Sequence, residues 1–327
     1  MTLSLTRDEL IRSQNFIAGR WCDAADAALL PVLDPADDRP ITRVPDSSAA
    51  DARAAVDAAQ AAFPAWRATQ AKQRAQLLKR WNDLIVMHQE DLGRLISREQ
   101  GKPLVEGRGE VLYAASYVEW FAEEATRAYG DMIPAPVSGR RMMSVKEPVG
   151  VVAAITPWNF PAAMIARKLA PAVVDVWLAD PRVRKVTFTG STPVGKHLAR
   201  ASADTLKKLT GATRSMELSC EETFGPVVPV FRFDSEDEVI ALANDTPFGL
   251  AAYFYTRDAA RVWRVADALE SGIVGINEGA LAAEAAPFGG VKESGYGREG
   301  SRHGLDDYMH IKYLCQGGLA ATGTSAH

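Results

Sequence analysis

Cysteine is scarce in this chain of 327 residues, which contains only Cys22, Cys220 and Cys315. The odd number and the lack of a Cys-x-x-Cys pair exclude a disulfide framework and a cysteine-ligated structural zinc, and they fit a reducing compartment. Two acidic residues directly after Cys220 oppose formation of its thiolate. The other two cysteines lie in apolar, strand-like surroundings, so all three are predicted to be structural residues rather than catalysts.

The chain also lacks a long apolar run and an excess of charge. The polar residues 1–14 have no apolar run that could serve as a signal peptide, so none is expected there. The apolar stretch 150–179 is interrupted by Arg167, Lys168 and Asp175. Lys and Arg number 37 against 41 Asp and Glu, which gives a net charge of −4. This balance provides no electrostatic reason to expect a nucleic acid or a membrane as partner. We therefore expect a cytoplasmic protein.

Spacings typical of metal or triad chemistry are absent as well. The five histidines show no metal-ligand spacing, so no metal site is expected, and no nucleophile elbow supports a Ser–His–Asp triad. What remains is ordinary for a soluble globular protein, with 47% hydrophobic and 24% charged residues. The length predicts about two domains, each large enough for a core.

The first half of the chain predicts strands followed by helices. Four prolines divide the first forty-five residues into short apolar pieces, which indicate strands and turns. Ser47 or Ser48 can cap a helix that runs through residue 63. A second helix is predicted from about Ala71 to Glu99, ended by Gly101, and a third over residues 111–130. Their apolar stripes predict core packing.

After residue 148 strands and helices alternate, which predicts an α/β architecture with mainly parallel sheets. The expected strands are residues 149–155, 183–190, 227–233, 251–256, 272–277 and 309–315, and the expected helices are residues 193–209, 234–244 and 259–269. The glycine-rich stretch 286–300 is too long for a simple turn, and such loops are often functional or pack against a neighbour. The small-residue tail is expected to be frayed.

The motif FTGSTPVGKH, residues 188–197, joins a predicted strand to a predicted helix. Free backbone N–H groups at the start of that helix favour an anion such as phosphate, and Gly190 and Ser191 allow a ligand to approach the backbone. A P-loop is disfavoured because His197 stands where Ser or Thr must hold Mg²⁺. A dinucleotide-phosphate site is favoured, and a turn without a ligand remains the alternative.

Two further stretches each have two interpretations. In TPWNFP, residues 156–161, Asn159 follows a strand and can aim its amide at a developing oxyanion, or it can cap a helix that begins at Pro161. In EETFGP, residues 221–226, the adjacent acids indicate a solvated turn, or a carboxylate and an aromatic ring that hold a ribose and stack on a nicotinamide.

Together these motifs resemble the aldehyde dehydrogenase family. PWNFP, FTGST, EETFGPV and APFGGVKESGYGREG occur in the family's order, and REQGKPL and NDTPFGLAAYFYTRD are most similar to its succinate-semialdehyde dehydrogenase branch. The resemblance extends from about Asn15 to Cys315. It implies an α/β fold with a Rossmann-type NAD(P)-binding domain (residues 1–209), an incomplete catalytic domain (210–300), and a C-terminal segment with the oligomerisation arm (301–327).

The resemblance also implies the chemistry, which is NAD- or NADP-dependent oxidation of an aldehyde to a carboxylic acid by a homo-oligomer. In that family a Cys thiolate attacks the aldehyde, hydride passes to the nicotinamide, and a Glu activates the hydrolytic water. Asn159 would stabilise the oxyanion. The implied cofactor-binding residues are Thr156, Pro157, Trp158, Gly190, Ser191, Glu222 and Phe224, and the implied substrate residues are Arg167, Phe160 and Phe288.

The sequence departs from the family at two joins. Ala172 runs directly into Val173, where the family has a further strand–helix–strand passage that holds the adenosine ribose. Leu209 runs directly into Thr210, where the family carries its general-base Glu and nucleophilic Cys. In addition, Ala282 replaces a substrate-loop serine. We therefore expect little or no activity and marginal stability. The alternative is a non-catalytic relative that binds nucleotide weakly or associates with a full-length homologue.

Overall fold

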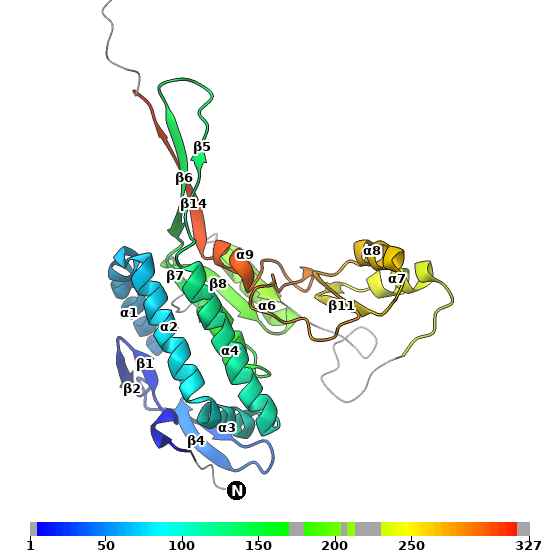
Figure 1. The fold of residues 1–327 in the computed structure, drawn as a ribbon. Coiled ribbons are helices and arrows are strands. Elements are labelled where there is room, and N and C mark those ends of the chain that lie inside the picture. The colour runs from blue at the N-terminus through cyan, green and yellow to red at the C-terminus, as the bar shows by residue number, and fades with distance from the viewer. Residues whose placement is uncertain (1–4, 170–179, 204–207, 213–229, 319–327) are drawn as a thin grey trace, which may run out of the picture.

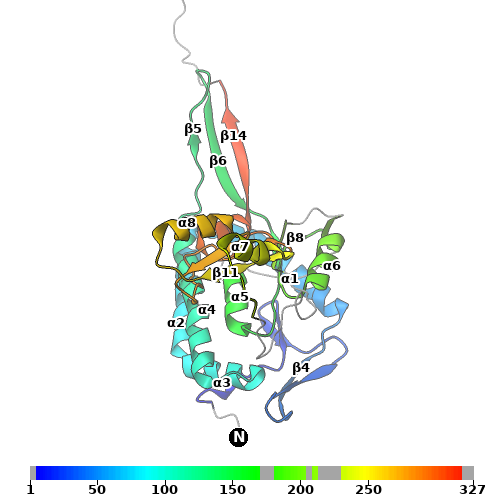
Figure 2. The ribbon, with the colours of Figure 1, turned by 90° about the vertical axis from the view of Figure 1, so that its right-hand side faces the viewer.

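The protein is described by a computed structural model over residues 5–169, 180–203, 208–212 and 230–318. A helical and α/β body carries two projections (Figure 1). A narrow arm built from β5, β6 and β14 rises from the body, and a lobe with α7, α8 and β11 extends to one side of it. Figure 2, turned by a quarter, shows that the arm keeps this direction and that the lobe lies in front of the body.

The N-terminal segment consists of short antiparallel hairpins, as the prolines predicted. A 3₁₀ turn (Asp8–Leu10) precedes β1 (Asn15–Ile17) and β2 (Arg20–Cys22), which pair with each other. β3 (Leu29–Leu33) then pairs with β4 (Pro40–Pro45).

Helix α1 (Ala49–Ala68) begins after Ser48, whose side chain accepts a hydrogen bond from the N–H of Ala50 at 3.2 Å. Ser48 is therefore the cap, while the Ser47 hydroxyl accepts from the amide of Asn15. The helix continues beyond the predicted end, because Pro64 is accommodated inside it.

The single helix expected over residues 71–99 is wrong, since the chain forms α2 (Ala71–Met87) and α3 (Gln89–Gln100) with a break at His88. Both helices pack on α4 (Leu104–Glu124). The Asp91 carboxylate in the first turn of α3 accepts hydrogen bonds from the N–H groups of Thr6 and Arg7 at 2.9 and 3.1 Å. This contact between distant segments has no signature in the helical periodicity. Gly101, at φ +87°, ends α3 as predicted.

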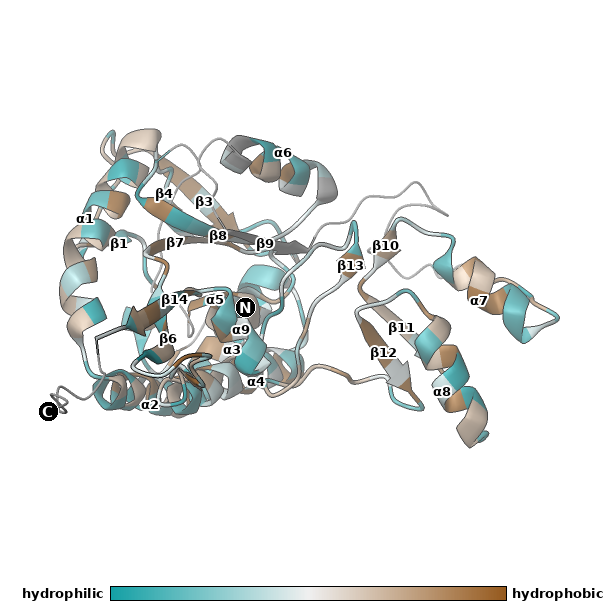
Figure 3. Ribbon diagram, turned by 90° about the horizontal axis from the view of Figure 1, so that it is seen from above, coloured by the Kyte–Doolittle hydropathy of each residue, from teal (hydrophilic) through white to brown (hydrophobic). Residues whose placement is uncertain are grey.

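The sheet at the centre of the body contains β7 (Val151–Ile155), β8 (Val183–Thr189) and β9 (Lys208–Ala212), all parallel and in this order. Val151 and Ala153 face α1 through Val56, whereas Val152 faces the opposite side and packs on Tyr308. Helix α5 (Pro161–Leu169) lies on β7 and α4, and α6 (Thr192–Ala203) follows β8. Figure 3 shows this sheet between α6 on one side and α5 on the other.

Strand β9 corrects the end of the helix predicted over residues 193–209: the described part of α6 is Thr192–Ala203, and Lys208 and Leu209 belong to the strand. The β9 residues pair with β8, for example Lys208 with Lys185 and Thr210 with Thr187. Pairing with β9 satisfies the backbone N–H and C=O groups along the edge of β8, which would stay unpaired if Lys208 and Leu209 were helical. Tertiary structure therefore overrides the helical pattern at these residues. The join between Leu209 and Thr210 lies inside this strand.

The lobe follows the predicted order of elements with one correction. It contains α7 (Glu236–Asn244), β10 (Phe248–Gly249), β11 (Ala251–Phe254), α8 (Ala259–Ala268), β12 (Ile273–Ile276) and β13 (Val291–Lys292). β11 and β12 are parallel, as expected. In the strand predicted over 227–233, residues 230–233 are irregular and 227–229 lie outside the described residues. Val230 is 89% exposed and is paired with no strand in the part of the chain that is described.

The arm was only partly expected. Strand β14 (Met309–Gln316) was predicted, but β5 (Met132–Ile133) and β6 (Arg141–Pro148) were not. All three are antiparallel, and β6 and β14 pair over eight residues. The expectation of mainly parallel sheets therefore holds for β7–β9 and for β11–β12, while the arm and the N-terminal hairpins are antiparallel.

The main core lies between α4, α5 and α9 (Ser301–Asp306). Its buried residues are Ala114, Tyr117, Val118, Phe121, Ala163, Ala166 and Leu305. This core fixes α5 against α4, and α5 leads directly out of the loop that contains Asn159. Within the described ranges no helix is both long and apolar enough to cross a membrane.

Candidate functional site

Two loops meet at one edge of the central sheet. Ile155 at the end of β7 pairs with Phe188 near the end of β8, so the loop 156–160 and the turn 190–191 leave neighbouring parallel strands at the same end. Ligands of open α/β sheets bind outside the carboxyl ends of the strands. The two sequence motifs singled out above therefore lie together at the edge where a cofactor is expected.

The loop after β7 presents Trp158 and Phe160 to solvent, at 65% and 41% exposure. Asn159 is half-buried, and its Oδ1 is a buried atom with no hydrogen-bond partner among the described residues. The interpretation of Asn159 as the cap of α5 is wrong, because the N–H groups of Ala162 and Ala163 donate instead to Oε1 of Glu110 at 2.8 and 3.3 Å. The Asn159 amide is thus not used to terminate the helix.

The turn after β8 brings Gly190 and Ser191 to the start of α6. The carbonyl of Ser191 accepts the first helical hydrogen bond, from the N–H of Gly195 at 2.9 Å. A Cβ at position 190 would lie 2.6 Å from the ring of Phe188, so glycine is required here by local packing. Lys196 forms an ion pair with Glu293 at 2.7 Å, which directs its ammonium toward the loop 286–300.

A cluster of buried charges lies behind the two loops. Glu299, from the glycine-rich loop, pairs with Arg167 and with Lys168, the latter at 2.5 Å. Lys168 also donates to Oγ1 of Thr189 at 2.8 Å, and the Arg167 guanidinium lies 4.6 Å from the centre of the Phe288 ring. The cluster therefore joins α5, the end of β8 and the loop 286–300.

The charges of this cluster stabilise one another. Burial alone would raise the pKa of Glu299, but the Lys168 ammonium and the Arg167 guanidinium outweigh it and hold the pKa below its ordinary value. Burial lowers the pKa of Lys168, whereas for Arg167 the effect of burial is reversed by the Glu299 carboxylate, which raises its pKa. The carboxylate stays ionised between two cations.

The predicted site residues are distributed unequally over this arrangement. The two loops bring together Thr156, Pro157, Trp158, Asn159, Gly190 and Ser191. Arg167 and Phe288 contact each other, but Arg167 is only 3% exposed and already paired with Glu299. Phe160 lies against Lys102 instead. Glu222, Phe224 and Cys220 lie outside the described residues.

Four charged residues around the site were not predicted: Lys102, Glu110, Lys168 and Glu299. A signal exists for Glu110, because it occupies a position four residues before Ala114 within the buried stripe of α4, where an apolar side chain is expected. The other three have no such signal, since their roles depend on contacts between segments distant in sequence. Metal-binding clusters of three or more His, Cys, Asp or Glu do not occur over the ranges described.

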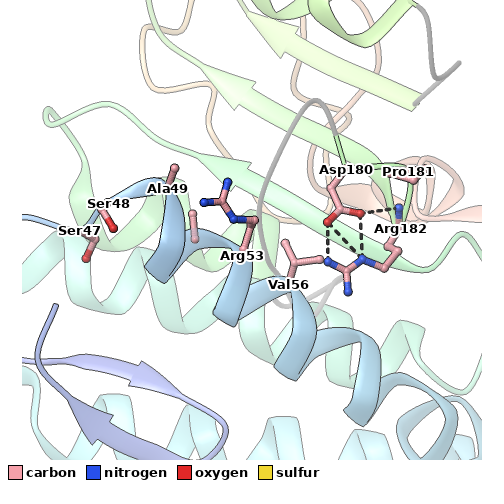
Figure 4. Close-up of a pocket in the computed structure, with 9 residues that line it drawn as sticks. Ser47, Ser48, Ala49, Arg53, Val56, Asp180, Pro181 and Arg182 are labelled. Atoms are coloured by element: carbon pink, nitrogen blue, oxygen red, sulfur yellow. Dashed lines mark hydrogen bonds and ion pairs between the residues drawn. The ribbon is translucent and has the colours of Figure 1, made fainter. Parts of the chain in front are cut away.

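A cavity of about 740 Å³ lies elsewhere, between the start of α1 and the residues that precede β8 (Figure 4). It is lined by Ser47, Ser48, Ala49, Ala52, Arg53, Val56, Asp180, Pro181 and Arg182. Arg182 is held there by Asp180 at 2.6 Å. The cavity adjoins the beginning of β8, whereas Gly190 follows its end, and a seven-residue strand spans roughly 23 Å. It is therefore distinct from the two-loop site.

Comparison with known proteins identifies relatives with this arrangement. The model of the "Aldehyde dehydrogenase family" matches residues 21–176, 173–212 and 209–314. The chain is 35% identical to the NADP-dependent succinate-semialdehyde dehydrogenase of Escherichia coli, with 96% of this chain and 100% of the relative covered, and 35% identical to the glutarate-semialdehyde dehydrogenase of Pseudomonas aeruginosa, with 97% and 100% covered. The crystal structure of a succinate-semialdehyde dehydrogenase from Burkholderia pseudomallei superimposes with a TM-score of 0.92 at 36% identity, covering 96% of this chain and 100% of that one.

The same comparisons locate the missing segments. The family match is divided into three parts that meet at residues 173–176 and 209–212, which agrees with the joins expected after Ala172 and Leu209. The alignment with the E. coli enzyme extends over 481 positions, so at least 154 of them (481 less the 327 residues of the chain) have no residue here. The chain retains both ends of its relatives and lacks interior segments.

Proposed function

The chain belongs to the aldehyde dehydrogenase family of NAD(P)-dependent enzymes, and we propose that it binds NAD(P) at the two-loop edge of its central sheet while turning over little or no aldehyde by itself. The observation that carries the proposal is the pairing of Ile155 with Phe188, which aligns the Asn159 loop with the turn 190–191. The substrate class we propose is a semialdehyde with a distal carboxylate, as in the names of the relatives.

The described residues fit the phosphate part of the cofactor. The first N–H groups of α6, after Ser191, have no intrahelical partners and suit a pyrophosphate. Thr156, Pro157 and Trp158 are accessible beside them. By resemblance Glu222 would hold the nicotinamide ribose and Phe224 would pack near the ring. When bound, the nicotinamide supplies the acceptor for hydride.

Asn159 is assigned the oxyanion role. Because the Asn159 side chain does not cap α5, its amide N–H is available to donate to the oxygen of an aldehyde. The oxygen and nitrogen of an Asn amide can be exchanged by a 180° rotation of the side-chain amide group, which places the N–H on either side.

Substrate binding by Arg167 requires an exchange of partners. Its guanidinium is buried and paired with Glu299, so a distal carboxylate has to replace Glu299 at the fork of nitrogen atoms. Phe288, against the same guanidinium, and Phe160 would line the path of the aldehyde. Ala282, at an exposed loop position, supplies no hydroxyl for that carboxylate.

The proposed loss of turnover follows from the missing thiolate. Cys22 lies on β2 and Cys315 on β14 of the arm, on elements distant from the two loops (Figure 1). Neither can replace a nucleophile at the site. Cys220 lies outside the described residues, and its two acidic neighbours oppose formation of its thiolate. Without a thioester there is no covalent intermediate to hydrolyse. The domain division at residues 209 and 300 is proposed on the same resemblance.

The test is binding without turnover. Titration calorimetry with NAD and NADP is expected to give a measurable dissociation constant, while absorbance at the NAD(P)H band with succinic semialdehyde stays at the level of a heat-killed control. Steady NAD(P)H production that is abolished in Asn159→Ala would overturn the proposed inactivity. A lack of heat with either nucleotide would overturn the binding.

A second function, association with a full-length homologue, is favoured by the arm. Met132 on β5 and Ile311 and Tyr313 on β14 are 54–72% exposed, and the arm that carries them projects from the body (Figure 2). Apolar side chains on a projecting sheet suit a partner subunit. Co-expression of this chain with a tagged full-length dehydrogenase is expected to retain both on the affinity column. A companion chain without residues 309–316 serves as the control.

A further inference from the structure

A buried ion pair lies directly under the Asn159 loop. Lys102, in the turn between α3 and α4, contacts Oε2 of Glu110 on α4 at 2.6 Å, and their side chains are 9% and 1% exposed. Charges removed from water in this way are retained only when their remaining hydrogen-bonding capacity is also satisfied. The arrangement around the pair meets that condition on both sides.

The Lys102 ammonium has three directions in which it can donate, and each has a partner. One N–H reaches Glu110, a second donates to the backbone carbonyl of Asn159 at 3.0 Å, and the ammonium lies 4.2 Å from the centre of the Phe160 ring. Two consecutive residues of the loop are therefore held by one cation, one through its backbone and one through its ring.

Glu110 completes the arrangement from the other side. Its second oxygen, Oε1, accepts from the N–H groups of Ala162 and Ala163, the first that α5 can offer because Pro161 has none. Glu110 thus acts as the cap of α5 although it lies on another helix, 52 residues earlier. The loop is fixed at Asn159 by Lys102 and immediately afterwards by Glu110.

We propose that Lys102, with Glu110, is a positioning residue that holds the backbone of Asn159 and Phe160 and so aims the Asn159 amide at the site. The assignment of that amide to the oxyanion rests on the proposed function, but the positioning itself does not. The pair touches neither the aldehyde nor the cofactor, and it acts through the loop. The fixed backbone leaves the Asn159 side chain few directions in which to point.

The experiment compares local order in the loop with global stability, without any ligand. The chain is labelled with 5-fluorotryptophan, and the Trp158 signal is assigned with Trp158→Phe. Amide exchange is followed at Ala162 and Ala163 and, as an internal reference, along β8. The variants are Lys102→Met, Lys102→Arg, and Lys79→Met as a matched control, since Lys79 forms an exposed pair with Glu123 at 3.9 Å.

In Lys102→Met we expect the Trp158 signal to split or broaden. Exchange at Ala162 and Ala163 should be at least tenfold faster, because the Glu110 carboxylate without its counter-charge turns away from α5 toward water, while β8 stays unchanged. Lys102→Arg, which keeps the charge and donors, is expected to restore a single signal, and Lys79→Met to match the wild type. A residue that only contributed to stability would speed exchange along β8 as well and would not be rescued by arginine.

A double variant covers the case in which Lys102→Met fails to fold with Glu110 left unpaired. Lys102→Met/Glu110→Gln removes both charges but keeps an acceptor for α5, so Ala162 and Ala163 stay protected while the Trp158 signal still splits. An unchanged single Trp158 signal in this variant overturns the positioning role. Failure of the wild type to bind NAD(P), by contrast, overturns the proposed function and leaves the positioning role standing.

Discussion

Glu299 is the residue on which the charges behind the site depend. It is the shared partner of Arg167 and Lys168, whose side chains are 3% and 0% exposed. Removal of one partner from a buried ionic group leaves an uncompensated charge, which is strongly destabilising, whereas the intact group contributes modestly. Loss of the Glu299 carboxylate should therefore destabilise the fold far more than loss of an exposed carboxylate in the same loop.

Glu299→Gln is therefore expected to lower the free energy of unfolding by roughly 3–5 kcal/mol, because two buried cations lose their counter-charge. Glu293→Gln is the matched control, since its pair with Lys196 is exposed and such pairs contribute about 0–1 kcal/mol. Urea unfolding followed by circular dichroism measures both. Equal midpoints for the two variants would contradict the role of Glu299.

The same residue predicts a pH dependence. The pKa of Glu299 is lowered in the folded chain, so its contribution is fully present above the unfolded value of about 4.3 and is lost as the pH falls through the lower folded value. The wild type should lose more stability than Glu299→Gln between pH 5 and pH 3. Parallel curves for the two proteins would show that Glu299 is not the group that titrates.

At the scale of the element, the start of α1 decides how one face of the central sheet is covered. Ser48 caps this helix, and Val56 two turns later packs against Val151 and Ala153 of β7. Ser47, one residue earlier, only accepts a hydrogen bond from Asn15 at the surface. The two serines are equivalent by sequence position and differ in structure.

Ser48→Ala should lower the free energy of unfolding by about 1 kcal/mol, since the helix loses its cap. Ser47→Ala, with the same chemical change, should have an effect within about 0.5 kcal/mol, as surface substitutions do. Thermal unfolding at one protein concentration compares them. A larger effect of Ser47→Ala would reverse the assignment of the cap.

At the scale of the whole molecule, the lobe exposes large apolar side chains. The lobe exposes Tyr253, Tyr255 and Trp263 at 51–71%, and Figure 3 shows it extending beyond the body. Parallel strands such as β11 and β12 normally occur with both faces buried. The exposed apolar side chains of the lobe thus occur in a chain that lacks interior segments of its relatives.

Restoration of those segments should restore turnover. A chimera that carries the E. coli relative's residues at both joins is expected to produce NADPH from succinic semialdehyde. In it, Asn159→Ala should lower kcat by about 10²–10³-fold through loss of the oxyanion donor. Insertion at the join after Ala172 alone is the control and should remain inactive. Activity of that control would show that the second segment does not carry the nucleophile.

Much of the fold and the family could be predicted from local patterns. The strand–helix order after residue 148, the cap of α1 as Ser47 or Ser48, and the end of α3 at Gly101 depend on neighbouring residues, and the structure agrees with them. The order of the motifs also indicated the family and both joins, because each motif occupies a short, contiguous stretch.

Tertiary structure alone decided the remainder, since it depends on residues far apart in the chain. The helix predicted through residue 209 is wrong at Lys208 and Leu209, which pair in β9 because β8 offers an open edge. The cap of α5 comes from Glu110, so Asn159 is released from a role that its position before Pro161 suggested. A sequence pattern records which neighbours a residue has along the chain. Only packing determines which charge, edge or backbone group it meets across space.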